Sequence, residues 1–169
     1  NDFWPGPLDD DGNTNDEVCG QFDRFWEVRS KDIDDYLALV SAQDGGDASA
    51  DVTIPAGSIP LSILKWPGRN NAYADISLPE DKNLAPFWDR DGDNDYDPTK
   101  GDYPVIDSKT QGVYADQMIW WVFNDKGDVH SETGGEAIGL QLNALAFAFA
   151  TNDEVNNMTF YKYGIENKA

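Results

Sequence analysis

The sequence of 169 residues is poor in basic residues, histidine and cysteine. It holds 12 Lys and Arg residues against 32 Asp and Glu residues, a formal net charge of −20, with 1 His and 1 Cys. This excess of acid argues against a nucleic-acid partner or an anionic membrane surface, because surfaces of the same sign repel each other. A single cysteine forms no disulfide within the chain, so the cysteine content neither indicates nor excludes an oxidising compartment.

Long apolar runs are also missing. No run approaches the roughly 20 residues that cross a bilayer, and the longest candidate is residues 144–150. We therefore expect no membrane insertion. With 40% hydrophobic residues, including 6 Trp, 7 Tyr and 8 Phe, the chain has enough large apolar surface to predict a folded domain.

The lack of histidine and cysteine limits the catalytic mechanisms open to the chain. A Cys-His or Ser-His-Asp mechanism would have to use His130, and no nucleophile motif accompanies it. Glycoside cleavage needs only two carboxylates, so spacing neither supports nor excludes it. We assign no catalytic residue.

The acidic residues are strongly biased toward aspartate, with 25 Asp and 7 Glu. Aspartate is a poor helix former, bonds its own backbone in turns and supplies oxygen ligands to hard cations. The bias predicts many loops and suggests calcium. The alternative is that the acid serves only solubility, as in a halophilic protein.

One segment, residues 89–102, concentrates these carboxylates at alternate positions. Side chains at the first, third and fifth positions with a backbone carbonyl at the seventh are how an EF-hand loop encloses calcium. In that register Asp95 supplies its carbonyl and Asn94 stands at the sharp turn, where a left-handed conformation is needed. The predicted calcium ligands are Asp89, Asp91, Asp93, Asp95, Asp97 and Asp102.

The match to an EF-hand loop is incomplete. The twelfth position is Lys100, and Pro98 with Gly101 argues against a following helix, so we expect a loop-only variant closed by Asp97 or Asp102. A register that starts at Asp91 puts Asp102 twelfth but Tyr96 at the turn. All candidate ligands are hard oxygens, which favours calcium over zinc or iron. A solvated acidic turn is the alternative.

The hydrophobic pattern predicts one helix and several strands. Ile33, Tyr36, Leu37 and Val40 follow a helical period over about residues 30–41, with Ser30 as the N-cap and a stop at Gly45. Residues 1–20 are expected to be loop. Residues 117–123 predict a strand that turns back at 124–127 as a hairpin.

Two further runs complete the predicted strands. Over 137–150 the alternation changes phase at Ala144, which suggests a β-bulge or a strand that passes between two faces. Residues 159–167 also alternate. We expect a mainly β fold, an antiparallel β-sandwich with one N-terminal helix and long irregular loops.

The expected organisation has two regions. Residues 1–110 form a loop-rich region with the helix and the acidic loop. Residues 111–169 supply the strands of the sandwich, which we expect to continue in a longer parent protein.

Several motifs resemble those of large secreted proteins of Bacteroidota that end in a type IX secretion sorting domain. The motifs are Asp23-Arg24-Phe25-Trp26, the segments 59–68, 84–87 and 116–125, Gly101-Asp102-Tyr103-Pro104 and Phe160-Tyr161-Lys162-Tyr163. The resemblance implies an N-terminal or internal region, without the sorting domain, of an extracellular, cell-surface or filament protein. That family commonly has Gly where this chain has Asn94.

Together these observations predict an extracellular structural or adhesive module whose acidic loop is ordered by calcium. Its expected partners are other copies of the chain or surface and filament proteins, with glycans as a further candidate. The alternative is a carbohydrate-binding or glycoside-cleaving module that uses exposed tryptophans and carboxylates.

Overall fold

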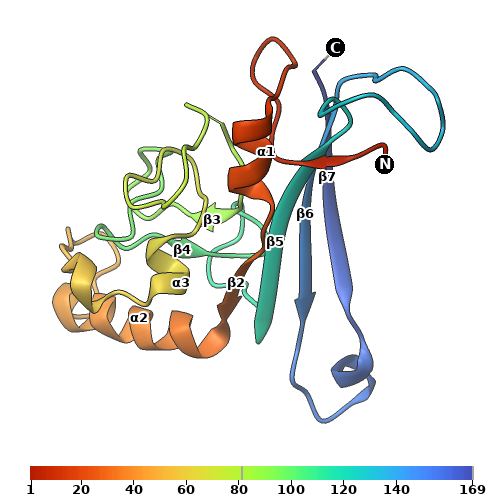
Figure 1. Cartoon of the computed structure of the whole chain (residues 1–169). Coiled ribbons are helices and arrows are strands. Elements are labelled where there is room, and N and C mark those ends of the chain that lie inside the picture. Colours follow the sequence, from red (N-terminus) through yellow and green to blue (C-terminus); the bar gives the residue numbers. More distant parts are fainter. Residues whose placement is uncertain (81, 169) are drawn as a thin grey trace.

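The computed structural model describes residues 1–80 and 82–168 (Figure 1). Helices and strands follow in the order β1 (Trp4–Pro5), α1 (Asp16–Phe22), β2 (Trp26–Arg29), α2 (Ser30–Asp44), η1 (Ala56–Ser58), α3 (Leu61–Leu64), β3 (Phe87–Trp88), β4 (Tyr103–Pro104), β5 (Gln117–Asn124), β6 (Leu140–Ala148), η2 (Glu154–Asn157) and β7 (Phe160–Asn167). The N-terminus and the end of β7 lie near the same end of the molecule.

The strands form an antiparallel sheet of five strands and a smaller ribbon of two. The large sheet has the order β1-β5-β6-β7, and β2 pairs with the same strand, β5, that pairs with β1. β3 and β4 form the ribbon. The expectation of antiparallel, mainly β structure is confirmed, whereas the sandwich stays a prediction. β1 and β2 belong to the N-terminal region, so this sheet joins the two expected regions.

The prediction of a single helix is wrong. The predicted helix is present as α2 and ends at Gly45, whose φ of 61° is left-handed as expected. Ser30 is its first residue and not the N-cap; that position is Arg29, which makes no side-chain cap. Among the described residues, no helix has the length and apolar character needed to cross a membrane.

A second helix, α1, lies in the stretch expected to be loop. The Asn15 side chain accepts a hydrogen bond from Val18 N at 3.0 Å and so caps its first turn. Val18 and Phe22, one turn apart, both pack on the core. A cap and one apolar pair are too short a pattern to predict a helix among turn residues.

β5 and β6 pair as predicted, but the prediction of a tight turn between them at 124–127 is wrong. Residues 125–139 make a long excursion, closed at its base by the buried Asp125 carboxylate, which accepts hydrogen bonds from Ile138 N and Leu140 N, both at 2.7 Å. β6 contains no bulge, because its residues pair one for one with β5 and β7. The change of phase at Ala144 instead reflects apolar side chains on both faces of β6.

The core lies on one face of the sheet. The buried apolar side chains of β5 are Met118, Trp120 and Val122, and they pack with Ile33, Tyr36 and Val40 of α2. Figure 1 shows α1, α2, α3 and the β3–β4 ribbon on the β5 side of the sheet, while β6 and β7 extend away from them. The acidic loop joins β3 to β4 and lies beside this core.

Candidate cation site in the acidic loop

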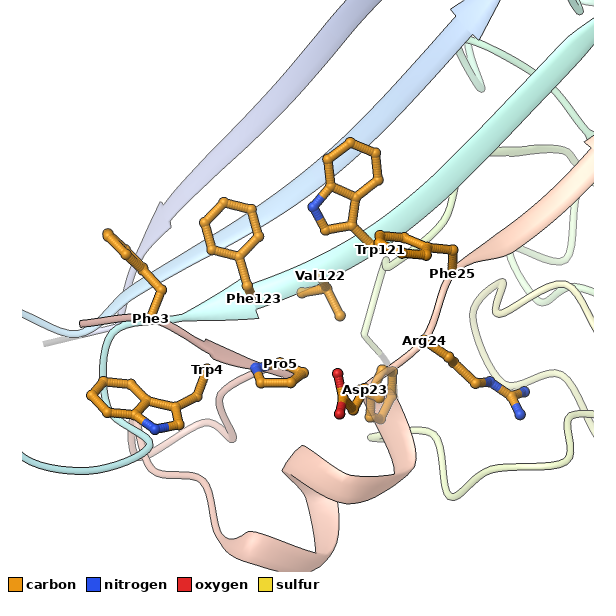
Figure 2. Close-up of a pocket in the computed structure, with 10 residues that line it drawn as sticks. Phe3, Trp4, Pro5, Asp23, Arg24, Phe25, Trp121, Val122 and Phe123 are labelled. Atoms are coloured by element: carbon orange, nitrogen blue, oxygen red, sulfur yellow. The ribbon is translucent and has the colours of Figure 1, made fainter. Parts of the chain in front are cut away.

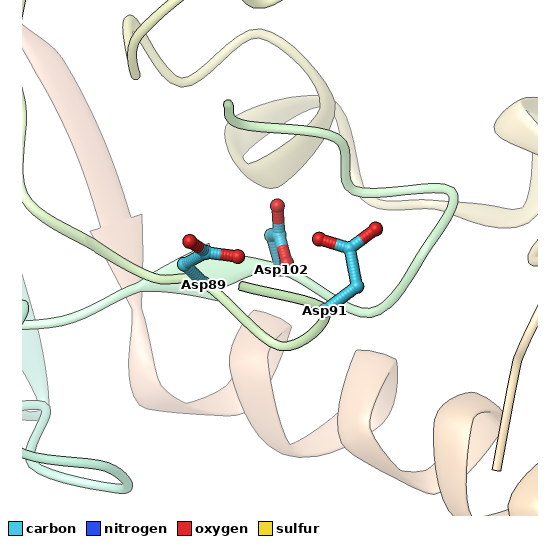
Figure 3. Close-up of side chains that lie close together, drawn as sticks. All are labelled: Asp89, Asp91 and Asp102. Atoms are coloured by element: carbon cyan, nitrogen blue, oxygen red, sulfur yellow. The ribbon is translucent and has the colours of Figure 1, made fainter. Parts of the chain in front are cut away.

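The β3–β4 ribbon brings the two ends of the acidic loop together. Phe87 pairs with Pro104 and Trp88 with Tyr103, so Asp89 leaves the ribbon directly opposite the point at which Asp102 enters it. Oxygens of Asp89, Asp91 and Asp102 all lie within 4.8 Å of one another (Figure 3). Of the predicted ligands, these three form the cluster.

Asp102 is the buried member of the cluster. Its side chain is 0% exposed, and its two oxygens accept hydrogen bonds from Arg90 N and Asp97 N, both at 2.8 Å. Burial, with a smaller contribution from the charges of Asp89 and Asp91, raises the pKa of this carboxyl to about 7. A cation beside Asp102 would favour its charged form.

Asp89 fixes the turn that follows it. Its two oxygens accept hydrogen bonds from Gly92 N and Asn94 N, both at 2.8 Å. Asn94 has a φ of 67° and is, with Asn70, one of two non-glycine residues with positive φ in the described chain. The left-handed turn therefore falls at the sixth position of the register that starts at Asp89. Tyr96, the turn residue of the other register, is buried in the core.

Asp91 and Asp93 share a cation from within the loop. The Lys100 ammonium lies 3.2 Å from Asp91 Oδ2 and 3.1 Å from Asp93 Oδ2. A hydrogen bond from Asp95 N and the contact with Lys100 lower the pKa of Asp93. The same two carboxylates, led by Asp93, raise the pKa of Lys100. A positive charge thus already bridges one side of the acidic loop.

The remaining predicted ligands turn to other partners. The Asp95 carboxylate accepts a hydrogen bond from Asn70 Nδ2 at 2.7 Å, and the use of its carbonyl as a ligand stays a prediction. Asp97 Oδ1 accepts hydrogen bonds from Thr99 N at 2.9 Å and Thr99 Oγ1 at 2.6 Å. Of the two residues expected to close the loop, the structure places Asp102 with Asp89 and Asp91.

Aromatic side chains anchor the loop in the core. Tyr96 is buried and its hydroxyl donates a hydrogen bond to Ile63 O at 2.7 Å, while the Tyr36 hydroxyl donates to Pro98 O at 2.7 Å. A β-carbon at Gly68 would lie 2.6 Å from Tyr96 Cβ, so a glycine is needed for the ring to enter. The backbone of the site is therefore held before any ligand binds.

The Arg90 side chain pairs with a group outside the cluster, although Arg90 lies between Asp89 and Asp91 in sequence. Its guanidinium binds Asp44 Oδ2 at 3.1 Å and Ala50 O at 2.9 Å. It crosses Gly101, where a β-carbon would lie 2.2 Å from Arg90 Cδ and where φ is 108°. The loop is thus tied to the C-terminal end of α2.

The segment that borders this site contains no residue that was predicted to be functional. Residues 48–53, with Arg90, Asp91 and Lys100, line a cavity of about 550 Å³. These small, mostly polar residues show no periodicity, and contacts distant in sequence bring them to the acidic loop, among them the hydrogen bond from Arg90 to Ala50 O.

The donor set fits a hard divalent cation. Three carboxylates converge, one of them buried, and every candidate ligand atom is an oxygen. Asp89, Asp91 and Asp102 would hold the ion, and Asp91 also pairs with Lys100.

Comparison of the chain with protein-family models, with curated proteins and with solved structures gave no match.

Proposed function

We propose that this chain is an extracellular structural or adhesive module in which calcium, held by the 89–102 loop, stabilises the fold. The observation that supports it best is the convergence of Asp89 and Asp91 on the buried Asp102. Three carboxylates that lie close together repel one another, and burial opposes the charge on Asp102. A bound cation would offset both unfavourable contributions.

Calcium would act through linkage to folding. An ion bound only by the folded chain adds about 3 kcal/mol at a hundredfold excess over its dissociation constant. That is a large share of the stability of one domain. The proposal includes a location outside the cell, where calcium is abundant, and a β-sandwich in which a second sheet covers the free face of β5, β6 and β7.

Thermal unfolding in calcium and in chelator, with magnesium as a control, tests the metal site. We expect calcium to raise the melting temperature by several degrees and magnesium to do less. Asp91→Asn should remove most of the rise. Asp107→Asn is the matched control. Like Asp91, Asp107 accepts a hydrogen bond from the backbone amide two residues later and pairs with a lysine, here Lys162. An equal calcium shift in both variants contradicts the assignment.

Carbohydrate binding is the second candidate and rests on a different part of the surface. Phe3, Phe25, Trp121 and Phe123 line an open cavity of about 270 Å³ beside Asp23 (Figure 2). Aromatic rings next to a polar group suit the stacking of a sugar ring. Asp23 is the one carboxylate among the residues that line this cavity, which favours binding over two-carboxylate cleavage.

A glycan array with the wild type and Trp121→Ala tests this second candidate. Saturable binding that the substitution removes would support it. Absence of binding to every glycan would eliminate it without bearing on calcium.

A further inference from the structure

The cavity beside Asp23 lies at a gap in the edge of the large sheet. β1 pairs with residues 123–124 of β5 and β2 pairs with residues 117–120, so Trp121 and Val122 lie between the two short strands. The turn 23–25 joins α1 to β2 and lines the same cavity. Figure 2 shows how this gap brings together side chains from β1, from β5 and from the turn.

Four aromatic side chains of this cavity form two edge-to-face pairs. Phe25 and Trp121 have ring centroids 5.7 Å apart, and Phe3 and Phe123 have centroids 5.5 Å apart. Phe25 is 69% exposed and Phe3 is 45% exposed, so both rings are open to a ligand. The volume of about 270 Å³ is just below the roughly 300 Å³ at which pockets for drug-sized ligands begin, which suits a single sugar ring.

Asp23 brings a negative charge to the cavity. Within residues 1–80 and 82–168, its carboxylate accepts no hydrogen bond and forms no ion pair. Asp23 is also the C-cap of α1, whose last turn contains no basic residue. A negative charge is unfavourable there, because the carbonyl end of a helix itself carries partial negative charge. A cation bound beside Asp23 would therefore offset the charges of the carboxylate and of the helix end.

Arg24 also lines the cavity, but its charge is engaged elsewhere. Its guanidinium forms an ion pair with Asp75, and its Cζ lies 4.6 Å from the centroid of the Trp26 ring. Figure 2 shows the Arg24 side chain extending away from Asp23. With a net charge of −20 on the whole chain, the field at this cavity attracts cations.

We propose that this cavity binds a sugar that carries a protonated amino group, with its ring on the aromatic side chains and its ammonium on the Asp23 carboxylate. The proposal rests on the carbohydrate-binding candidate described above and names its ligand class, and it does not involve the calcium site. A neutral sugar would leave the charge of Asp23 without a partner. A cation without a ring would leave the exposed aromatic surface uncovered.

Calorimetric titration with two sugar trimers, carried out in chelator, tests the proposal. One probe is the trimer of glucosamine, at a pH at which its amino groups are protonated. The other is the same trimer with every amino group acetylated, which has the same rings and linkages but no charge. We expect the basic trimer to bind about tenfold more tightly, because a hydrogen bond between charged groups is stronger than one between neutral groups.

Three variants test whether the ligand occupies this cavity. Asp23→Asn should lower the affinity for the basic trimer about tenfold and leave that for the acetylated trimer unchanged. Phe25→Ala removes an exposed ring without opening the core, so it should weaken the binding of both trimers. Asp51→Asn is the control, because it removes the same charge from an exposed carboxylate that lines a different cavity, and it should change neither affinity. Circular dichroism checks that each variant folds.

Four results would overturn the proposal. The first is equal or tighter binding of the acetylated trimer, which would retain the carbohydrate-binding candidate with a neutral ligand. The second is binding of the basic trimer that Asp23→Asn does not weaken. The third is binding of trilysine as tight as that of the basic trimer, with neither weakened by Phe25→Ala, as expected for general attraction to an acidic chain. The fourth is the absence of binding of both trimers, after which the glycan array alone decides on the carbohydrate-binding candidate.

Discussion

Asp102 differs from most acidic residues of this chain because its carboxylate is buried. Two backbone amides bind it, yet burial and the nearby Asp89 and Asp91 raise its pKa to about 7. A carboxyl whose pKa is higher in the folded than in the unfolded chain takes up a proton on folding. The residue at the centre of the candidate site therefore makes stability depend on pH.

In chelator, the melting temperature should fall as the pH is raised from about 5 to about 8. The protonated Asp102 stabilises the fold, and this stabilisation is lost as the pH rises through the pKa of about 7 that the group has in the folded chain. With saturating calcium the trend should reverse, since calcium binds the charged form. Melting curves at several pH values measure both. The decline in chelator should be absent in Asp102→Asn; a decline of the same size in that variant would show that another group titrates.

Gly68 is a second residue on which the site depends, because a side chain there would meet the Tyr96 ring. Gly68→Ala should destabilise the fold by about 1–3 kcal/mol, as overpacking does. It should also weaken calcium binding by shifting the loop. Gly57→Ala is the control, since its β-carbon would meet nothing within 4 Å. Urea unfolding measures the first effect and calorimetric titration the second. Equal unfolding curves for the two variants would show that the Tyr96 ring does not need a glycine at position 68.

At the scale of the element, the acidic loop is held by Lys100 on one side and by the ribbon on the other. The ammonium bridges Asp91 and Asp93 and so relieves part of their repulsion. It also competes with any cation that these two carboxylates would bind. The balance between lysine and metal is thus a property of the loop as a whole.

Lys100→Gln should lower the melting temperature in chelator and raise the affinity for calcium. Removing the ammonium restores the repulsion between the two carboxylates and frees their oxygens. Lys109→Gln, another exposed lysine near a loop aspartate, should change neither quantity. Calorimetric titration with calcium, together with melting in chelator, measures both effects. Calcium affinity that stays unchanged in Lys100→Gln would show that Asp91 and Asp93 do not bind the ion.

The sequence was most informative where a pattern is local. The period of Ile33, Tyr36 and Val40 predicted α2, and the position of Asn94 predicted its left-handed turn. The alternation of β5, β6 and β7 predicted their strands. Each of these depends on neighbours within a few residues.

Features that depend on distant contacts were not predictable. The choice of Asp102 over Asp97 follows from the pairing of β3 with β4, two strands of two residues each. The excursion between β5 and β6 follows from the buried Asp125. Neither strand length nor composition indicates such contacts, because a two-residue strand has no period and a buried aspartate resembles any other in sequence.

At the scale of the whole molecule, the charge of −20 opposes the compact state as well as association. Exposed ion pairs, such as that between Lys31 and Asp35, relieve little of it. The molecule should therefore respond to screening even without a specific ion.

In chelator, sodium chloride should raise the melting temperature steadily, by several degrees between low and high salt, because screening weakens the repulsion among carboxylates. In saturating calcium the rise should be smaller, since the densest group of carboxylates is already neutralised. Differential scanning calorimetry at several salt concentrations measures this. A melting temperature that falls with salt in chelator would mean that the attractive pairs outweigh the repulsion.

The meeting of Asp89 and Asp102 at the mouth of the ribbon has a consequence for the unfolded chain as well. A cation that joins them would act as a removable cross-link around residues 89–102. In the chain-entropy treatment of disulfides, closing a loop of about 15 residues is worth about 3 kcal/mol. In this chain with one cysteine, such a cross-link would form and break with the cation concentration of the medium rather than with its redox state.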